Sequence, residues 1–193
     1  LVFLKEWEVS GGYLRRNEIP GENKRLFYKE PDFKDGMVRF DFQFDGASDI
    51  RLVTGSSGHY NTVLHIRPDH FYLQTASDPR GPWFSMRHGE CSYQFEPEKW
   101  YTMTIEFIGD EVVAHLSDKH LVYAKHPIIH QERTYFALQV DQAGARFDNL
   151  QVFQVGRHRN YADNLIALKK IEGKFPVTKT VEVEYETRKR NAH

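Results

Sequence analysis

The chain of 193 residues has a single cysteine, no long apolar run and almost no net charge. Cys91 alone cannot form an internal disulfide or a cysteine-based zinc cluster, and its place between Glu90 and Ser92 fits a buried small residue better than a nucleophile. No run approaches the roughly 18 apolar residues of a membrane-spanning helix. The formal net charge of −1 provides no whole-chain attraction to nucleic acid or to an anionic membrane. These absences predict a protein with neither a nucleic-acid partner nor a membrane span.

No long helical pattern occurs before residue 160. Hydrophobic residues make up 40% of the chain and aromatic residues 14%, which suffices for one packed core. We expect two parts. The first is a β domain at residues 1–156. The second, at 157–193, is a helix that begins at Asn160 and ends at Gly173, followed by an alternating tail. This segment is expected to pack on the domain or on a partner, including a second copy of the chain.

Short segments of alternating apolar and polar residues fill the β domain. Met37–Phe44 is the clearest, with four apolar side chains on one face and polar residues such as Arg39 and Asp41 on the other. Lys99–Val155 contains four more such segments, separated by turns. Roughly ten strands at a spacing of about 8–12 residues predict an all-β jelly-roll sandwich of two antiparallel sheets. In the strand Tyr60–Arg67, strict alternation places four residues on one face and four on the other: Tyr60, Thr62, Leu64 and Ile66 are opposite Asn61, Val63, His65 and Arg67.

A family resemblance rests on a series of motifs in the second half of the chain. They are Trp100 at the start of a strand, the turn Gly109-Asp110, the strand residues Ala137–Gln139, and Arg146–Leu150 with Val152. Together they resemble the concanavalin A-like lectin/glucanase superfamily. Within that superfamily they look most like the 3-keto-disaccharide hydrolase domains, which are common in secreted bacterial proteins. Trp7–Gly12 and Phe33–Phe44 are similar in style to the start of such domains. The resemblance covers about residues 3–155 and implies a secreted or periplasmic, sugar-active protein.

The same resemblance implies a catalytic set. A 3-keto sugar has an acidified proton beside its ketone, which a base removes while cationic groups stabilise the enolate. His65 or His59 is the candidate base, with Asp41 or Asp141 as rival, and Arg51 and Arg67 are the candidate stabilisers because guanidinium presents a rigid donor fork. The catalytic prediction is therefore His65, Arg51, Arg67 and Asp141. At Ala47–Leu52 the chain departs from the Asn-Ser-Gly-Ile-like segment of that family.

Further polar and aromatic positions are candidates for contacting a sugar. In a jelly roll one sheet commonly curves into a concave surface, where polar side chains reach hydroxyl groups and aromatic rings cover the apolar face of a pyranose. The alternative is an ordinary solvated face with cross-strand ion pairs. The predicted substrate-binding residues are Arg39, Asp41, His59, Tyr60, Trp83, Glu106, His115 and Gln139.

Two other kinds of site, that of a conventional glycosidase and that of a bound metal ion, have weaker support in the sequence. A conventional glycosidase needs two carboxyl groups about 5–9.5 Å apart. Glu106 and Asp141 are the candidates, but the E-x-D-x-x-E run of many glucanases with this fold is missing.

The ten histidines are scattered, which disfavours a zinc site. A structural calcium ion is the remaining cofactor prediction, with Asp148 and either Asp45 or Asp49 as ligands; the alternative for Asp148 is a turn or edge cap.

Three functional hypotheses remain open at this point. The first is a sugar-active domain that cleaves 3-keto-glycosides by hydrolysis or elimination. The second is a non-catalytic, lectin-like carbohydrate-binding module. The third is a structural or adhesion domain that docks onto a partner through residues 157–193. The position of Arg51, His65, Arg67, Gln139 and Asp141 decides between them, because the first hypothesis requires these residues to converge on one surface.

Overall fold

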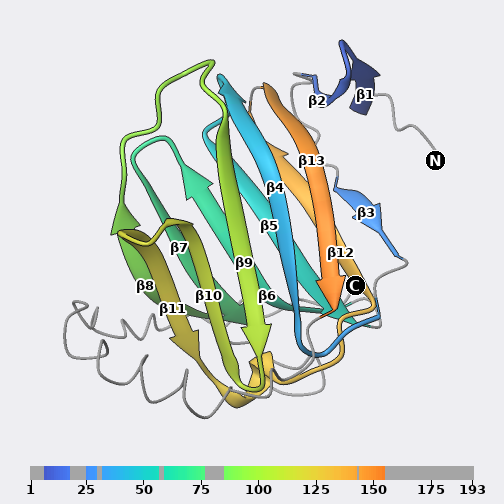
Figure 1. The fold of residues 1–193 in the computed structure, drawn as a ribbon, viewed down its shortest axis with the longest axis vertical. Helices are drawn as coiled ribbons and strands as arrows, with labels where there is room; N and C mark the ends of the chain where they lie inside the picture. The colour runs from blue at the N-terminus through green and yellow to red at the C-terminus, as the bar shows by residue number, and fades with distance from the viewer. Residues whose placement is uncertain are drawn as a thin grey trace, which may run out of the picture.

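The fold is taken from a computed structural model. It describes residues 7–17, 25–29, 32–56, 59–76, 85–142 and 144–154. Within these ranges thirteen strands form two antiparallel sheets, and there is one short 3-10 helix (Figure 1). None of these residues forms a helix long and apolar enough to cross a membrane. Trp83 and the predicted helix and tail at 157–193 lie outside the described residues, as does the side chain of His59.

The first sheet has seven strands. Their spatial order is β1 (Trp7–Ser10), β2 (Tyr13–Arg16), β13 (Gly144–Gln154), β4 (Gly36–Asp45), β9 (Tyr101–Ile108), β10 (Glu111–Ser117) and β11 (His120–Lys125). The last of the described strands thus lies between two of the first. This insertion, together with the matching one in the other sheet, gives the jelly-roll topology.

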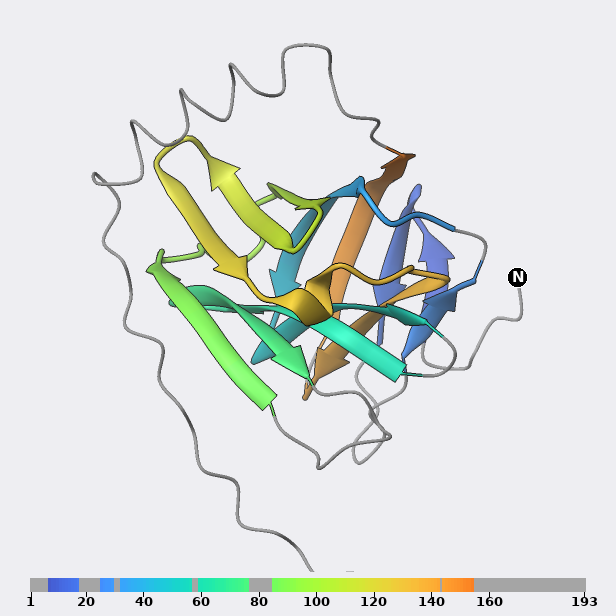
Figure 2. The same ribbon diagram turned by 90° about the horizontal axis from the view of Figure 1, so that it is seen from below.

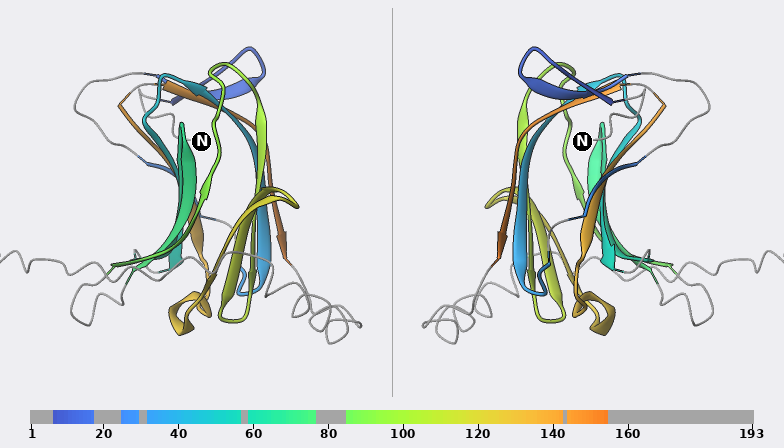
Figure 3. Two further views of the ribbon diagram at one scale, coloured as in Figure 1. Left: turned by 90° about the vertical axis from the view of Figure 1, so that its left-hand side faces the viewer. Right: turned by 90° about the vertical axis from the view of Figure 1, so that its right-hand side faces the viewer.

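The second sheet has six strands. Their order is β3 (Leu26–Tyr28), β12 (Tyr135–Asp141), β5 (Asp49–Ser56), β6 (His59–Arg67), β7 (His70–Ala76) and β8 (Ser85–Ser92). The 3-10 helix η1 (Pro127–Ile129) precedes β12. The two sheets form two facing layers (Figure 2), and one end of the six-stranded sheet bends away from the other layer, which makes its outer face concave along the strands (Figure 3). The predicted all-β, two-sheet sandwich is confirmed.

The core lies between the sheets and consists of the alternating apolar residues of both. Phe40 and Phe42 of β4 are fully buried, as are Leu52 of β5 and Leu64 of β6. Burying one such side chain is worth about 1.5–3 kcal/mol. The neighbours of these residues along each strand point to the outer faces, meaning the faces turned away from the opposite sheet. The alternation predicted for Met37–Phe44 is therefore confirmed.

A β-bulge corrects the predicted orientation of Tyr60. Thr54 pairs with Thr62, but the next residue, Gly55, pairs with Tyr60, so that Asn61 is the extra residue. One inserted residue reverses the side-chain alternation beyond it. Tyr60 consequently lies on the outer face, where it packs beside Val63. The predicted grouping of Tyr60 with Leu64 and Ile66 on one face is wrong, because strict alternation does not account for a bulge.

A buried arginine connects the chain segment before β4 to the segment between η1 and β12. Arg133 is 0% exposed; its guanidinium donates to the carbonyl oxygens of Lys34 at 2.7 Å, Gln131 at 3.0 Å and Ile129 at 2.5 Å. Its Cζ lies 3.8 Å from the ring centroid of Phe107. Burial lowers the pKa of Arg133 to about 9, so the group remains charged at neutral pH, and the backbone carbonyls stabilise that charge.

Candidate ligand-binding face of the six-stranded sheet

Strand register places five polar residues side by side across the six-stranded sheet. Residues that pair directly across antiparallel strands project from the same face. Here the pairs run without interruption from β12 to β8, and their neighbours along the strands are core residues, so all five lie on the outer face. This polar row consists of Gln139, Arg51, His65, Tyr72 and Glu90.

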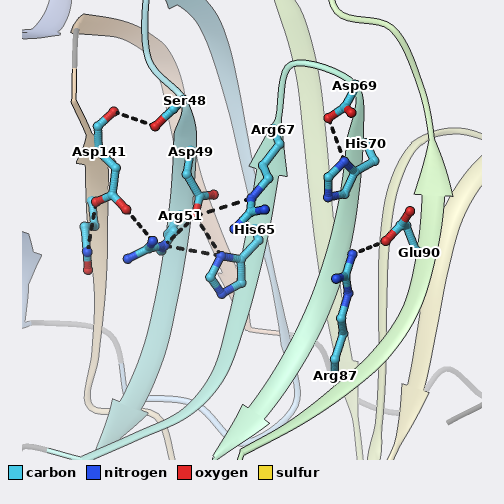
Figure 4. Close-up of polar contacts among 11 residues, drawn as sticks. Ser48, Asp49, Arg51, His65, Arg67, Asp69, His70, Arg87, Glu90 and Asp141 are labelled. Atoms are coloured by element: carbon cyan, nitrogen blue, oxygen red, sulfur yellow. Dashed lines mark hydrogen bonds and ion pairs between the residues drawn. The ribbon is translucent and has the colours of Figure 1, made fainter. Parts of the chain in front are cut away.

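Asp49 is the centre of an ion-pair network beside the polar row. Its Oδ2 accepts a hydrogen bond from Nε of Arg51 at 2.8 Å and lies 3.0 Å from Nδ1 of His65 and 3.9 Å from Nε of Arg67 (Figure 4). Arg51 also pairs with Asp141 through Nη2. Burial alone would raise the pKa of Asp49, but the hydrogen bonds and charges of His65 and Arg51 outweigh burial and lower it. Asp49 therefore remains an acceptor and does not serve as a proton donor.

The network selects one tautomer of His65. Nδ1 of His65 lies 3.0 Å from the carboxylate of Asp49 and 3.2 Å from Nε of Arg51. Because Nε of Arg51 is itself a donor to Asp49, a proton on Nδ1 of His65 satisfies the carboxylate, and the neutral ring then has its lone pair on Nε2. Nε2 has no hydrogen-bond partner among the described residues and is not among their buried, unpaired atoms. It offers an acceptor to a ligand on the outer face.

Tyr72 is held between two planar groups. Its ring is stacked on that of His65, with centroids 4.5 Å apart and an angle of 6° between the planes. Cζ of Arg87 lies 3.8 Å from the Tyr72 centroid, and because β6 and β8 flank β7, these two groups cover opposite sides of the ring. Tyr72 therefore offers a ligand its hydroxyl edge rather than a π-face. Burial raises the pKa of Tyr72, so the hydroxyl stays protonated and can donate.

An apolar half adjoins the polar row on the same outer face. Val53, Val63, Ala137 and Tyr135 pack together there, with Tyr60 partly buried against them. Arg25 connects the two halves, since its Nε donates to Oε1 of Gln139 at 2.7 Å and its Cζ lies 5.4 Å from the Tyr60 centroid. The face is thus amphipathic, which is the character required to bind an amphipathic ligand.

Of the predicted catalytic and substrate-binding residues whose side chains the structure describes, six lie on this face and four do not. Tyr60 belongs to the apolar half, and the other five lie in or beside the polar row. Arg51, His65, Arg67, Gln139 and Asp141 lie together, as the hypotheses of a sugar site require. The other four belong to strands of the seven-stranded sheet and alternate with its core residues, so they lie on the opposite outer face of the sandwich. They are Arg39, Asp41, Glu106 and His115.

The separation of the two faces corrects the conventional glycosidase hypothesis. Glu106 and Asp141 lie on opposite outer faces, and the two sheets of a sandwich are about 10 Å apart, before the side chains extend outward. Both groups are also engaged locally. Nε2 of His115 lies 3.0 Å from Oε1 of Glu106, and this hydrogen bond lowers the pKa of Glu106. These two carboxyls cannot flank one glycosidic bond.

Of the predicted calcium ligands, Asp148 and Asp49 lie on different sheets, and Asp45 pairs with two arginines. Asp148 lies on β13 of the seven-stranded sheet, whereas Asp49 lies on β5 of the other and contacts two cationic or polar nitrogen groups. Asp45 is bound by Arg15 and Arg146, each at 3.2 Å. Among the described residues, no three histidine, cysteine or acidic side chains are grouped so that they could hold a metal ion.

Tyr72 and Arg87 are site residues that sequence reasoning missed. The strand containing Tyr72 was predicted, but its pairing with His65 was not drawn from the turn at Pro68-Asp69, which sets the β6–β7 register. Arg87 reaches the row through a bulge in β8, where Glu90 pairs with Tyr72 but His88 pairs with Leu73. The adjacency of His65 and Tyr72 was the one available signal, since the two strands form a hairpin.

Comparison with known proteins places the fold but not a family. The sequence matches no protein-family model and no curated protein. Its structure resembles the carbohydrate-binding module CBM66 from Bacillus subtilis, with a TM-score of 0.59 and 15% identity over 77% of this chain and 91% of that one. It also resembles chicken galectin 2, with a TM-score of 0.52 and 15% identity over 67% of this chain and 99% of that one. Part of a sialidase matches 88% of this chain with a TM-score of 0.58 and 13% identity, over 18% of its own length.

These neighbours define the class of fold. The chain is a concanavalin A-like jelly roll of the kind found in galectins and in a carbohydrate-binding module. At such identities the likeness establishes the architecture and leaves the ligand to be argued from the residues. The finer resemblance to 3-keto-disaccharide hydrolases has no matching family model.

Proposed function

We propose that this protein is a lectin-like carbohydrate-binding domain whose ligand lies on the outer face of the six-stranded sheet. The observation that carries the proposal is the polar row, in which planar side chains from five adjacent strands stand side by side next to an apolar half. A sugar has hydroxyl groups around its rim and apolar C–H faces, so it matches both halves. The two similar structures whose names refer to carbohydrate binding or galectins support this class of ligand.

The charges on the face suit hydroxyl groups better than a free anion. Arg51 is neutralised by Asp49 and Asp141, and Arg87 is paired with Glu90. Each such pair presents fixed N–H donors beside fixed carboxylate acceptors. A sugar hydroxyl both donates and accepts, and can therefore bridge such a pair without displacing either partner.

Two conservative variants test this assignment. Tyr72→Phe removes one hydroxyl and leaves the stacking intact, and Arg67→Ala removes a side chain whose nearest carboxylate is 3.9 Å away, so neither should impair folding. Losing one hydrogen bond to a ligand costs about 0.5–1.5 kcal/mol, which corresponds to roughly a three- to tenfold loss of affinity. Binding is measured first on an array of neutral and acidic glycans and then by calorimetry with the oligosaccharides that bind.

Arg39→Ala is the matched control, because Arg39 is an exposed arginine on the opposite outer face. The proposal predicts unchanged glycan affinity for Arg39→Ala and weaker binding for both Tyr72→Phe and Arg67→Ala. Trp83→Ala is included to test the sequence prediction for Trp83. Equal affinities for Arg67→Ala, Tyr72→Phe and the unmodified protein would exclude this face as the binding site.

The orientation of His65 favours a second candidate function, cleavage of 3-keto-glycosides by elimination. A base whose Nδ1 is fixed by a carboxylate and whose Nε2 is open has the arrangement of a general base. Nε2 would take the proton from the carbon between the ketone and the anomeric carbon. The electron pair would form the enolate near Arg67. Collapse of the enolate would form a double bond between that carbon and the anomeric carbon and break the glycosidic C–O bond, and the departing oxygen would take the proton from Nε2 of His65 and leave as the aglycone alcohol. Release of that alcohol from a 3-keto-glycoside, lost in His65→Gln, distinguishes this candidate from binding alone.

A further inference from the structure

An exposed tryptophan lies on the opposite side of the sandwich from the polar row. Trp100 immediately precedes β9 and is 41% exposed, whereas Trp7 is buried. The ring of Trp100 meets that of Tyr13 edge to face, with centroids 6.0 Å apart. Cζ of Arg146 lies 5.4 Å from the Tyr13 centroid. The strands β2, β13, β4 and β9 are consecutive neighbours in the seven-stranded sheet, so these side chains form one continuous surface.

Charged groups on the same face are fixed next to these rings. Arg146 donates through Nη1 to Oε1 of Gln43 at 2.9 Å and through Nη2 to Oδ2 of Asp45 at 3.2 Å. Arg15 donates to the same Asp45 oxygen at 3.2 Å. Gln43 is in turn held by donating to the backbone carbonyl of Glu98. The guanidinium and carboxylate groups are therefore positioned before any ligand arrives, which reduces the entropy lost on binding.

The composition of this surface decides what class of ligand it fits. The exposed ring of Trp100 contacts Tyr13, and the charged groups of Arg146, Arg15 and Asp45 lie on neighbouring strands of the same face. A pyranose needs one aromatic ring for its apolar face and fixed donors and acceptors for its hydroxyls. That combination is what Tyr13, Trp100, Arg146, Arg15 and Asp45 provide, and we call these residues the Trp100 surface.

We propose that the Trp100 surface is a second carbohydrate-binding site, with a pyranose ring packed on Trp100 and its hydroxyls bonded to Arg146 and Asp45. This inference rests on the proposed function, because it assigns the same class of ligand to a second face. Two sites on opposite faces of one sandwich cannot contact the same short oligosaccharide. They bind two chains, or two distant segments of one chain, and so raise the affinity for a polysaccharide above that for its fragments.

The test separates the two faces by mutation. The protein is titrated by calorimetry with cello-, xylo-, manno-, galacto- and fructo-oligosaccharides of four to six units. The four proteins compared are the unmodified chain, the double variant Arg67→Ala/Tyr72→Phe, Trp100→Ala, and the triple combination. The expected stoichiometry is two sugars for the unmodified protein and one for each of the double variant and Trp100→Ala. The triple variant should bind none. Trp100→Phe, which retains a ring, should recover part of the affinity lost in Trp100→Ala.

Tyr123→Ala is the matched control. Tyr123 is a 45% exposed aromatic residue on β11 of the same sheet, so its removal reports the general effect of deleting a surface ring. Trp100 fluorescence gives an independent readout in a Trp83→Phe background, because Trp7, the other remaining tryptophan, is buried. A bound sugar should lower the quenching of Trp100 fluorescence by acrylamide several-fold. Thermal melts confirm that each variant is folded.

Each remaining outcome contradicts a specific claim. If the double variant Arg67→Ala/Tyr72→Phe loses all binding and Trp100→Ala loses none, the second site is refuted and the proposed function stands. If only Trp100→Ala loses binding, the Trp100 surface is the sole site and the polar row is not one. If no oligosaccharide binds the unmodified protein and acrylamide quenching is unchanged by soluble polysaccharide, both proposals fail.

Discussion

The stability of the fold should depend on the protonation of one buried histidine. His88 is 8% exposed, and its Nε2 lies 2.7 Å from Oγ1 of Thr75. Burial, and then the charge of His126 with its ring centroid 6.3 Å away, lowers the pKa of His88 from 6.5 to about 4. The folded state thus favours the neutral ring. The stabilisation is complete above pH 6.5, where His88 is neutral in both states, and is lost as the pH falls from 6.5 through 4, because the unfolded chain binds the proton first.

The size of the effect follows from the two pKa values. Each pH unit between them is worth about 1.36 kcal/mol. On the order of 2 kcal/mol should therefore be lost by pH 5, and roughly 3 kcal/mol by pH 4. Since a domain of this type is stable by only about 5–15 kcal/mol, a loss of this size is readily measured.

The variant His88→Gln isolates this contribution. A glutamine amide can still bond to Thr75 but does not titrate, so urea unfolding curves should depend much less on pH between 7 and 4. Asp49 and Glu106, whose pKa values are lowered, lose their contributions at acid pH in both proteins and cancel in the difference. His126→Gln should retain most of the pH dependence, because burial is the larger cause. Parallel stability–pH curves for the unmodified protein and His88→Gln would refute the reasoning.

Two further substitutions test the architecture. Arg133→Met should destabilise the fold by about 3–5 kcal/mol, because three backbone carbonyls, one of them in a buried and two in part-buried hydrogen bonds, lose their donor. Urea unfolding at pH 7 measures the loss, and a loss below 1 kcal/mol would show that the carbonyls are satisfied otherwise. Gly144→Ala would place a Cβ 2.9 Å from the backbone oxygen of Arg16 and should cost about 1–3 kcal/mol. The thermal midpoint should fall accordingly, whereas Gly12→Ala, whose Cβ meets nothing within 4 Å, should suffer only the strain of its positive φ.

Strand identity could be predicted from the sequence because it is a local property. In Met37–Phe44 every second residue is apolar, and that pattern permits one face in the core and one in water. The position of each strand in its sheet is not local. β13 lies between β2 and β4, although about a hundred residues of sequence or more separate it from either, and nothing in the alternation of any of these strands encodes that neighbour.

The candidate site was only partly predictable for the same reason. Arg39 and Arg51 have the same signature, a charged residue between two core residues, yet they lie on opposite faces of the sandwich. Alternation identifies an outward-facing residue but not the sheet to which it belongs. The position of Tyr60 depended in addition on a single extra residue, Asn61, which interrupts the pairing with β5.

Asp49 offers a way to distinguish binding from catalysis at the polar row. In the native protein its carboxylate requires the proton of His65 on Nδ1, so Nε2 is an acceptor or a base. Asp49→Asn can instead donate from its amide to Nδ1, which favours the tautomer with the proton on Nε2. A sugar hydroxyl accepts a hydrogen bond as readily as it donates one, so glycan affinity measured by calorimetry should fall less than about tenfold. Proton abstraction requires a free lone pair on Nε2, so turnover of a 3-keto-glycoside should fall by about a hundredfold or more. Equal losses of binding and turnover would mean that Asp49 acts by holding Arg51 in place rather than by setting the tautomer of His65.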